Sequence, residues 1–205
     1  MTFFEKMYKM FQPAVFKLWR IQVSGEENIP EGGAIVASNH TAFSDVLVIS
    51  ASTKRQVRYM AKKELFKVPL LAQLIRGLGA YPVNRGGADV SSIKLTISML
   101  EAGELIGIFP QGHRHGKKDP RTTEVKAGVG MIAYRSKAPI VPVFIDNARG
   151  KTGILRKNYV TFGKPIYFDE LEFVSGGQTE YLNASKIIFR KVCEIKFGEG
   201  NGRLE

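Results

Sequence analysis

Apolar residues along the chain alternate between short continuous runs and the three-to-four-residue spacing of an amphipathic helix. The runs predict strands over residues 21–25, 33–38, 57–61, 79–83, 105–109, 140–145 and 159–163. The helical spacing predicts helices that begin after residue 40 and over residues 69–78, 90–100, 128–137 and 184–197. Strands that alternate with helices are typical of an α/β fold. We therefore expect a single α/β domain with a mixed sheet flanked by helices.

The helix over residues 90–100 has the clearest predicted boundaries. Its apolar positions repeat at helical spacing: Val90, Ile93, Ile97 and Leu100. Asp89 is expected to cap its N-terminus, because a carboxylate there accepts hydrogen bonds from free backbone amides. Gly103 is expected to end it, since glycine readily adopts the left-handed conformation that follows many helices.

The first twenty residues have an amphipathic pattern of their own. The apolar positions of one helical face are Phe4, Tyr8, Phe11, Val15 and Leu18. The cations Lys6, Lys9, Lys17 and Arg20 fall on the opposite side, which is typical of a helix that lies in a lipid interface. Pro13 either kinks one helix or begins the second helix of a hairpin. We expect residues 1–20 to form a membrane-associating helix or helical hairpin ahead of a domain over residues 21–205; the alternative is a helix packed on that domain.

The composition is that of a folded, basic protein. Hydrophobic residues make up 44% of the 205 residues, and 30 Lys and Arg against 19 Asp and Glu give a formal charge of +11. Such a charge favours polyanionic partners, among them an anionic membrane surface. The cations are scattered, without a basic run or a zinc-finger or RNA-recognition signature, so no nucleic-acid partner is expected.

The single cysteine and the short apolar runs indicate where in the cell the protein is expected. Cys193 is the only cysteine, so no internal disulfide can form and a reducing cytoplasmic setting is the default. The apolar runs are far shorter than the roughly 20 residues that span a bilayer. We therefore expect a monotopic or peripheral protein on the cytoplasmic face of a membrane.

A histidine and an aspartate stand five residues apart in the segment SNHTAFSD. In one regular helix the side chains of His40 and Asp45 would point apart. They can meet if His40 lies in the turn after strand 33–38 and Asp45 lies in the first turns of the following helix. The carboxylate would then fix the imidazole tautomer and stabilise the imidazolium, which makes His40 a general base aimed at a hydroxyl. From the spacing alone a structural role is favoured, because an aspartate near a helix start usually caps the helix and an isolated histidine is often structural.

Two loops combine arginine with glycine. NRGGAD places Arg85 and two glycines just before the helix over residues 90–100, where free amides and a guanidinium could hold a phosphate. QGHRHGKK places Arg114 after another strand. Either arginine alone is more typical of a solvated turn, whereas two such loops at strand ends favour a shared anion site.

His113 and His115 leave a metal site open as an alternative. Together with His40 and Asp45 they supply enough nitrogen and oxygen ligands for a metal, as in a metal-dependent hydrolase. No second metal motif such as HExxH accompanies them, and residues two apart in a loop have no fixed ligand geometry, so no metal site is expected. A non-catalytic lipid-binding module is the other alternative, although it leaves the spacing of His40 and Asp45 unexplained.

The blocks NHTAFSD, GAYPVNR, FPQGHRH and IVPV, in this order, resemble the glycerolipid acyltransferase family that includes 1-acylglycerol-3-phosphate acyltransferases. The resemblance covers about residues 20–165. It implies that His40 and Asp45 are the catalytic HxxxxD pair and that Arg85 ends the second motif. Gly112 and Arg114 match the third motif, Pro142 matches the fourth, and Lys62 matches a basic position common in these enzymes.

The third motif departs from the family pattern FPEGTR at two positions. Gln111 stands in place of the glutamate and His113 in place of the threonine. Glutamine keeps hydrogen-bonding capacity but lacks the charge. Gln111 is therefore expected to contact substrate, without any role that needs a carboxylate.

The resemblance implies transfer of a fatty acyl group from a thioester of acyl carrier protein or coenzyme A to the 2-hydroxyl of 1-acylglycerol 3-phosphate. The implied product is phosphatidic acid, and no cofactor is implied. Arg85 and Arg114, with Lys62, would hold the phosphate of the lysophospholipid acceptor. Glycerol 3-phosphate and other lysophospholipids are alternative acceptors.

Overall fold

The computed structural model describes residues 3–83 and 90–201. The strands are β1 (Ile21–Ser24), β2 (Ala34–Ser38), β3 (Val57–Lys62), β4 (Ala80–Val83), β5 (Leu105–Ile108), β6 (Ile140–Asp146) and β7 (Asn158–Phe162). The α-helices are α1 (Phe3–Leu18), α2 (Asp45–Ala51), α3 (Pro69–Gly77), α4 (Val90–Glu101), α5 (Gly128–Ser136) and α6 (Gln178–Phe197). Short 3-10 helices are η1 (Glu26–Asn28), η2 (Lys63–Lys67), η3 (Pro120–Thr122) and η4 (Phe168–Leu171).

Within the described residues, the strands form one seven-stranded sheet in the order β1-β7-β6-β2-β5-β3-β4. The strands from β6 to β4 run parallel, while β7 pairs antiparallel with β6 and parallel with β1. The sheet is therefore mixed, as predicted. The carboxyl ends of its parallel strands meet at one edge, where open α/β sheets commonly bind ligands.

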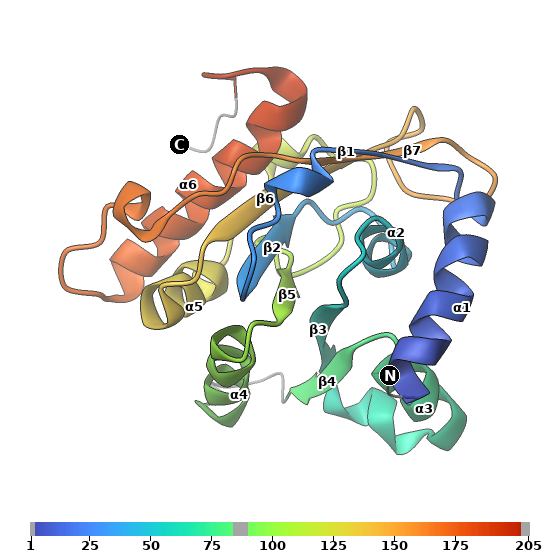
Figure 1. The fold of residues 1–205 in the computed structure, drawn as a ribbon. Helices are drawn as coiled ribbons and strands as arrows, with labels where there is room; N and C mark the ends of the chain where they lie inside the picture. Colours follow the sequence, from blue (N-terminus) through green and yellow to red (C-terminus); the bar gives the residue numbers. More distant parts are fainter. Residues whose placement is uncertain (1–2, 84–89, 202–205) are drawn as a thin grey trace.

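The central strands are buried on both faces, and their side chains alternate between two cores. In β2, Ile35 and Ala37 belong to one apolar cluster, whereas Ala34 and Val36 belong to the other. Such strands read as continuous apolar runs because both faces exclude water. The first core is closed by α4, α5 and α6, and the second by α2 and the end of α1. Figure 1 shows these two helical layers on opposite sides of one α/β domain, as predicted, with α3 beside α1.

The N-terminal segment is one continuous helix, α1, with Pro13 inside it, so the helical-hairpin alternative is wrong. Its inner side packs on the domain through Val15, and the Gln12 side-chain amide donates to the backbone oxygens of Ala51 (3.2 Å) and Thr53 (2.9 Å). Phe11 and Leu18, which were expected on the same face as Val15, stay exposed, as do Met10 and Phe16. Helix α1 therefore packs on the domain and also exposes apolar side chains to solvent.

Helix α4 lies where its spacing predicted, but its buried face is rotated from the expected one. Val90 is exposed and Ile93 and Ile97 are half-buried, whereas Ser92 and Thr96 are buried. The Thr96 hydroxyl donates to the Ser92 backbone oxygen at 2.7 Å and contacts the Tyr81 hydroxyl at 2.8 Å. Paired hydroxyls can be buried at low cost, which explains why periodicity of apolar residues missed this face. The expected cap Asp89 lies outside the described residues.

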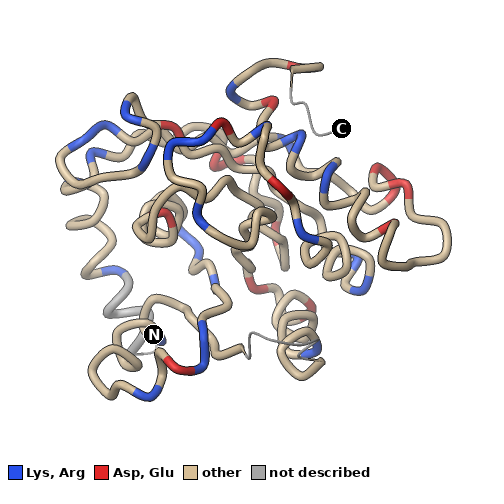
Figure 2. The backbone as a smooth tube through the Cα atoms, turned by 180° about the vertical axis from the view of Figure 1, so that it is seen from behind, with Lys and Arg blue, Asp and Glu red and all other residues tan. Residues whose placement is uncertain are grey.

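Charge is spread over the molecule. Figure 2 shows Lys and Arg on helices and loops around the whole fold, with fewer Asp and Glu among them. Among the described helices, none is both long and apolar enough to cross a bilayer.

Candidate active site

His40 and Asp45 meet at the carboxyl end of β2. His40 lies in the turn after the strand and Asp45 is the first residue of α2. The His40 Nδ1 and Asp45 Oδ2 atoms are 2.8 Å apart, so the contact predicted from the sequence is present. The neighbouring Asn39 fixes the end of β2, because its side chain exchanges hydrogen bonds with the backbone of Ile145 at 2.8 and 3.0 Å. The turn that holds His40 is thus attached to β6.

The Asp45 carboxylate is fully buried and accepts a set of hydrogen bonds. Its Oδ2 accepts from the backbone amides of Thr41 (2.5 Å) and Ala42 (2.8 Å) as well as from His40. Its Oδ1 accepts from the hydroxyls of Thr41 (3.1 Å) and Thr152 (2.7 Å). Every partner presents a hydrogen, which suits an acceptor-only carboxylate. Because Asp45 Oδ2 takes the hydrogen on Nδ1, the lone pair of His40 is on Nε2.

The His40 ring is held from one side by an aromatic side chain. It stacks on Phe109 at a centroid distance of 3.9 Å, and Phe109 in turn faces Tyr59 at 6.0 Å. The His40 side chain is 14% exposed, so part of the ring is open to solvent. Phe43, in the turn between His40 and Asp45, is 67% exposed. The pair formed by His40 and Asp45 therefore has apolar neighbours, Phe109 and Phe43.

Gln111 holds the turn that contains His40 through a hydrogen bond to its backbone. Its side chain is 1% exposed, and its Oε1 accepts from the His40 backbone amide at 2.7 Å. Its Nε2 donates to the Thr123 hydroxyl at 2.7 Å. Both ends of the glutamine thus have protein partners. A contact between Gln111 and substrate stays a prediction.

The expected phosphate-binding residues lie in different surroundings. Arg114 is exposed and has no ion pair with another described residue; Lys62, at the end of β3, is also exposed. Gly112 has a φ of 73°, a left-handed conformation that glycine adopts without strain, and it turns the chain between buried Gln111 and the exposed loop. Arg85 lies outside the described residues.

The other two histidines lie next to each other, with ring centroids 4.4 Å apart. The backbone amide of His115 donates to the His40 backbone oxygen at 3.0 Å, which joins the two loops. Burial and the nearby His113 and Lys118 lower the pKa of His115. Among the described residues, no group of three or more His, Cys, Asp or Glu side chains is placed to hold a metal ion.

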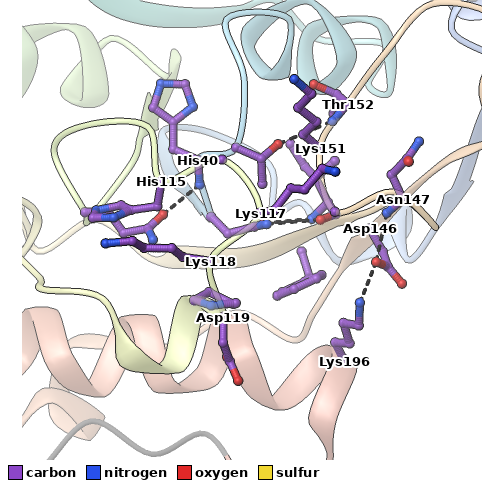
Figure 3. Close-up of a pocket in the computed structure, with 18 of the residues that line it drawn as sticks. His40, His115, Lys117, Lys118, Asp119, Asp146, Asn147, Lys151, Thr152 and Lys196 are labelled. Atoms are coloured by element: carbon purple, nitrogen blue, oxygen red, sulfur yellow. Dashed lines mark hydrogen bonds and ion pairs between the residues drawn. The ribbon is translucent and has the colours of Figure 1, made fainter.

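A cavity of about 260 Å³ adjoins the turn that holds His40. His40, Thr41 and Gln111 form part of its wall, and Figure 3 shows the His115–Asp119 loop and the β6–β7 connection on other sides. Four lysines line it: Lys117, Lys118, Lys151 and Lys196. Lys196 pairs with Asp146 at 2.6 Å. The lining therefore has more lysines than carboxylates, which are Asp119 and Asp146, and it also includes Phe144 and Phe197.

Sequence reasoning missed Thr152, Thr41 and Phe109 as parts of this site. Thr41 and Phe109 belong to the blocks around His40 and Gln111, so their closeness along the chain was a usable signal. Thr152 is 107 residues from Asp45, and a threonine in a loop gives no sequence signal for such a contact.

The lone thiol is placed away from this chemistry. Cys193 is buried in α6 within the core, and burial raises its pKa to about 12. A thiol in such an environment is a poor nucleophile.

Comparison with known proteins gives consistent matches. The family model described as Acyltransferase matches residues 20–146. The chain is 32% identical over 151 residues to the 1-acyl-sn-glycerol-3-phosphate acyltransferase of Bacillus subtilis (strain 168), a match that covers 72% of this chain and 74% of that one. It is 30% identical over 168 residues to the protein of that name from Streptococcus pneumoniae (strain ATCC BAA-255 / R6), covering 77% and 61%.

A solved structure has the same fold. The 1-acyl-sn-glycerophosphate (LPA) acyltransferase PlsC from Thermotoga maritima superposes with a TM-score of 0.66, at 24% identity, over 96% of this chain and 84% of that one.

Proposed function

Because this chain belongs to the acyltransferase family, we propose that it transfers a fatty acyl group from a thioester to the 2-hydroxyl of 1-acylglycerol 3-phosphate, forming phosphatidic acid. Membership makes the chain an acyltransferase. The choice of acceptor is supported by the names of the two bacterial relatives. The observation that supports the mechanism most directly is the 2.8 Å contact between His40 Nδ1 and buried Asp45.

In the proposed reaction, His40 is the general base. Its Nε2 takes the proton of the acceptor hydroxyl while the hydroxyl oxygen bonds to the thioester carbonyl carbon. Asp45 stabilises the imidazolium that forms. The tetrahedral intermediate then collapses, the carbon–sulfur bond breaks, and the imidazolium returns the proton to the departing sulfur. The acyl group passes directly between the substrates, so no nucleophile of the protein is needed.

The acceptor phosphate is proposed to bind at cations near the site. Arg114 and Lys62 are exposed and available at the loop after β5 and at the end of β3, and Arg85 completes the set expected from the sequence. A guanidinium forms charge-assisted, often bidentate hydrogen bonds with phosphate. The acyl donor is proposed to be a thioester of acyl carrier protein or coenzyme A, without a further cofactor.

The protein is proposed to act on the cytoplasmic surface of a membrane. Exposed apolar side chains on α1, with Lys9 and Lys17, fit a helix that lies among lipid headgroups. Phe43 extends this apolar character to the catalytic turn. A lysophospholipid could then reach His40 without leaving the interface.

A panel of substrates tests the proposed function. Purified protein is given 1-acylglycerol 3-phosphate, glycerol 3-phosphate, another lysophospholipid or a monoacylglycerol, each with acyl carrier protein and coenzyme A thioesters. We expect phosphatidic acid from the first acceptor and much less product from the others. Preferred acylation of glycerol 3-phosphate, or transfer to none of the acceptors, would contradict the proposal.

A further inference from the structure

Thr152 reaches the catalytic carboxylate from a distant part of the chain. It lies on the connection between β6 and β7, and its hydroxyl is 2.7 Å from Asp45 Oδ1. The residue is only 5% exposed. Figure 3 shows it at the upper end of the cavity, beside the catalytic turn. The contact is buried and short, which makes it a strong candidate for a role in positioning Asp45.

The hydrogens in this cluster can be assigned from the geometry. A carboxylate only accepts, so the Thr152 hydroxyl must donate to Asp45 Oδ1. The Thr152 oxygen then accepts, and the Ser44 hydroxyl, 2.6 Å away, must be the donor. The result is a directed chain from Ser44 to Thr152 to Asp45 to His40. In such a chain each hydrogen bond polarises the next.

We propose that Thr152 is a positioning residue that fixes the Asp45 carboxylate and, through it, the His40 tautomer and ring. This inference rests on the roles of His40 and Asp45 in the proposed function. Asp45 Oδ2 is held by the backbone of its own turn, whereas Oδ1 is held by the hydroxyls of Thr41 and Thr152. Thr152 is the member of this set that ties the carboxylate to a different element.

The connection that holds Thr152 is itself tightly fixed. The Asn147 side-chain amide donates to the Lys157 backbone oxygen at 2.8 Å and to Asn158 Oδ1 at 3.1 Å, which ties its two ends together. The Asn158 side-chain amide also donates to the backbone oxygens of Gly153 (3.1 Å) and Arg156 (2.8 Å). A loop closed by buried amides resists movement, so it can set the position of Thr152.

The same connection is joined to the end of α1. The Leu155 amide donates to the Leu18 backbone oxygen at 2.8 Å, and the Asn158 side-chain amide donates to the Trp19 backbone oxygen. The β6–β7 connection therefore links the end of α1 to the Asp45 carboxylate. Leu155 and Asn158 make its hydrogen bonds to the end of α1, and Thr152 makes its hydrogen bond to Asp45.

The test compares Thr152→Val with Thr152→Ser. Valine keeps the shape but removes the hydroxyl, and serine keeps the hydroxyl. We expect Thr152→Val to lower kcat roughly 10- to 100-fold, as the loss of a partner that orients a catalytic group does. KM for both substrates should stay within about twofold, because the Thr152 hydroxyl is already engaged by Asp45 and Ser44. Thr152→Ser should recover most of the lost kcat.

Two controls separate positioning from a merely structural role. Thr96→Val removes another buried, hydrogen-bonded threonine hydroxyl, on the far face of the sheet, and should leave kcat unchanged. In a His40→Ala background, Thr152→Val should cause no further loss, because Thr152 acts only through His40 and Asp45. Circular dichroism and the melting temperature confirm that each variant is folded.

Three results would show that Thr152 does not position Asp45. A folded Thr152→Val protein with wild-type kcat, a Thr152→Ser loss as large as that of valine, or a further loss in the His40→Ala background would overturn the inference. In those cases the proposed function stands as long as His40→Ala itself is inactive. Full activity of His40→Ala would instead remove the proposed mechanism.

Discussion

Gln111 has a hydrogen-bonding position that a glutamate could not occupy in the same way. The Thr123 hydroxyl donates its single hydrogen to the Pro120 backbone oxygen at 2.6 Å, so toward Gln111 it can only accept. The Gln111 amide supplies the matching donor while its oxygen accepts from the His40 amide. Gln111, which stands in place of the glutamate of the family motif, thus has in Thr123 an acceptor that only an amide can serve.

Gln111→Glu is therefore predicted to destabilise the fold. A carboxylate would face the acceptor side of the Thr123 hydroxyl in a buried site, and an unsatisfied buried polar contact costs about 1–3 kcal/mol. Chemical denaturation measures the free energy of unfolding. Gln73→Glu, on the exposed side of α3, is the matched control and should change little. Equal stability of Gln111→Glu and the wild type would show that Thr123 simply turns its hydrogen.

Arg114→Ala is predicted to discriminate between acceptors. Removing the guanidinium should lower kcat/KM for 1-acylglycerol 3-phosphate by roughly 10-fold or more, because a hydrogen bond between charged groups is lost. A monoacylglycerol has no phosphate, so its slower acylation should be unaffected. Lys164→Ala, an exposed lysine after β7, serves as the control. Equal proportional losses for both acceptors would place the phosphate elsewhere.

For single residues, the sequence predicted a contact between two side chains of the same short segment. The contact of His40 with Asp45 followed from their spacing across the junction of a strand and a helix. The contacts of Asp45 with Thr152 and of Gln111 with Thr123 did not, because they join residues from separate loops and depend on how those loops fold. The glutamine was expected at a substrate, whereas its partners in the structure belong to the protein.

Among the elements, α1 and α3 share an exposed apolar character. Met10 is 64% exposed on α1 and Leu70 is 83% exposed on α3. The two helices contact each other and lie on the same side of the molecule (Figure 1). Neighbouring exposed apolar side chains on a soluble surface commonly mark an interaction site.

Met10→Glu and Leu70→Glu are predicted to weaken binding to anionic vesicles, and the double variant should bind least. Each charge would have to enter the lipid interface beside anionic headgroups. Co-sedimentation with vesicles is the measurement. Val174→Glu, at a still more exposed apolar position before α6, is the control and should bind as the wild type does. Undiminished sedimentation of the double variant would exclude α1 and α3 as the contact. Point changes are preferable to removal of residues 1–20, because Gln12 and Val15 also pack α1 on the domain.

The positions of helices and strands along the chain were easier to predict than which face of a helix is buried. Apolar runs located the strands because the central sheet is buried on both faces. The choice between a helix and a hairpin at Pro13, and the buried face of α4, depended on contacts with α2 and with Tyr81. Local periodicity contains no information about such contacts.

Across the whole molecule, the sheet edge joins two environments at His40. On one side lie Phe109 and the exposed Phe43; on the other lies the lysine-lined cavity. An acyl chain packs against apolar side chains, whereas a charged headgroup binds to cations. The arrangement supports the proposed reaction of a lysophospholipid with an acyl thioester.

Exhaustive chelation is predicted to leave the activity unchanged. His40 must keep the Nε2 lone pair free to accept a proton, and its Nδ1 is already bonded to Asp45, so a metal on His40 would block the proposed role. Activity before and after dialysis against a chelator, with elemental analysis of the protein, makes the test. One metal per chain and activity lost on chelation would favour the metal-dependent alternative.

The most direct test of the account is the turnover of His40→Ala with 1-acylglycerol 3-phosphate and an acyl thioester. Loss of a positioned general base typically lowers the rate roughly 10²- to 10⁴-fold, and we predict a loss in this range with the fold intact. Asp45→Asn should be nearly as damaging, because the Nδ1 hydrogen would lose its charged partner. A well-folded His40→Ala protein that keeps half or more of the wild-type turnover would contradict the role of His40 as general base.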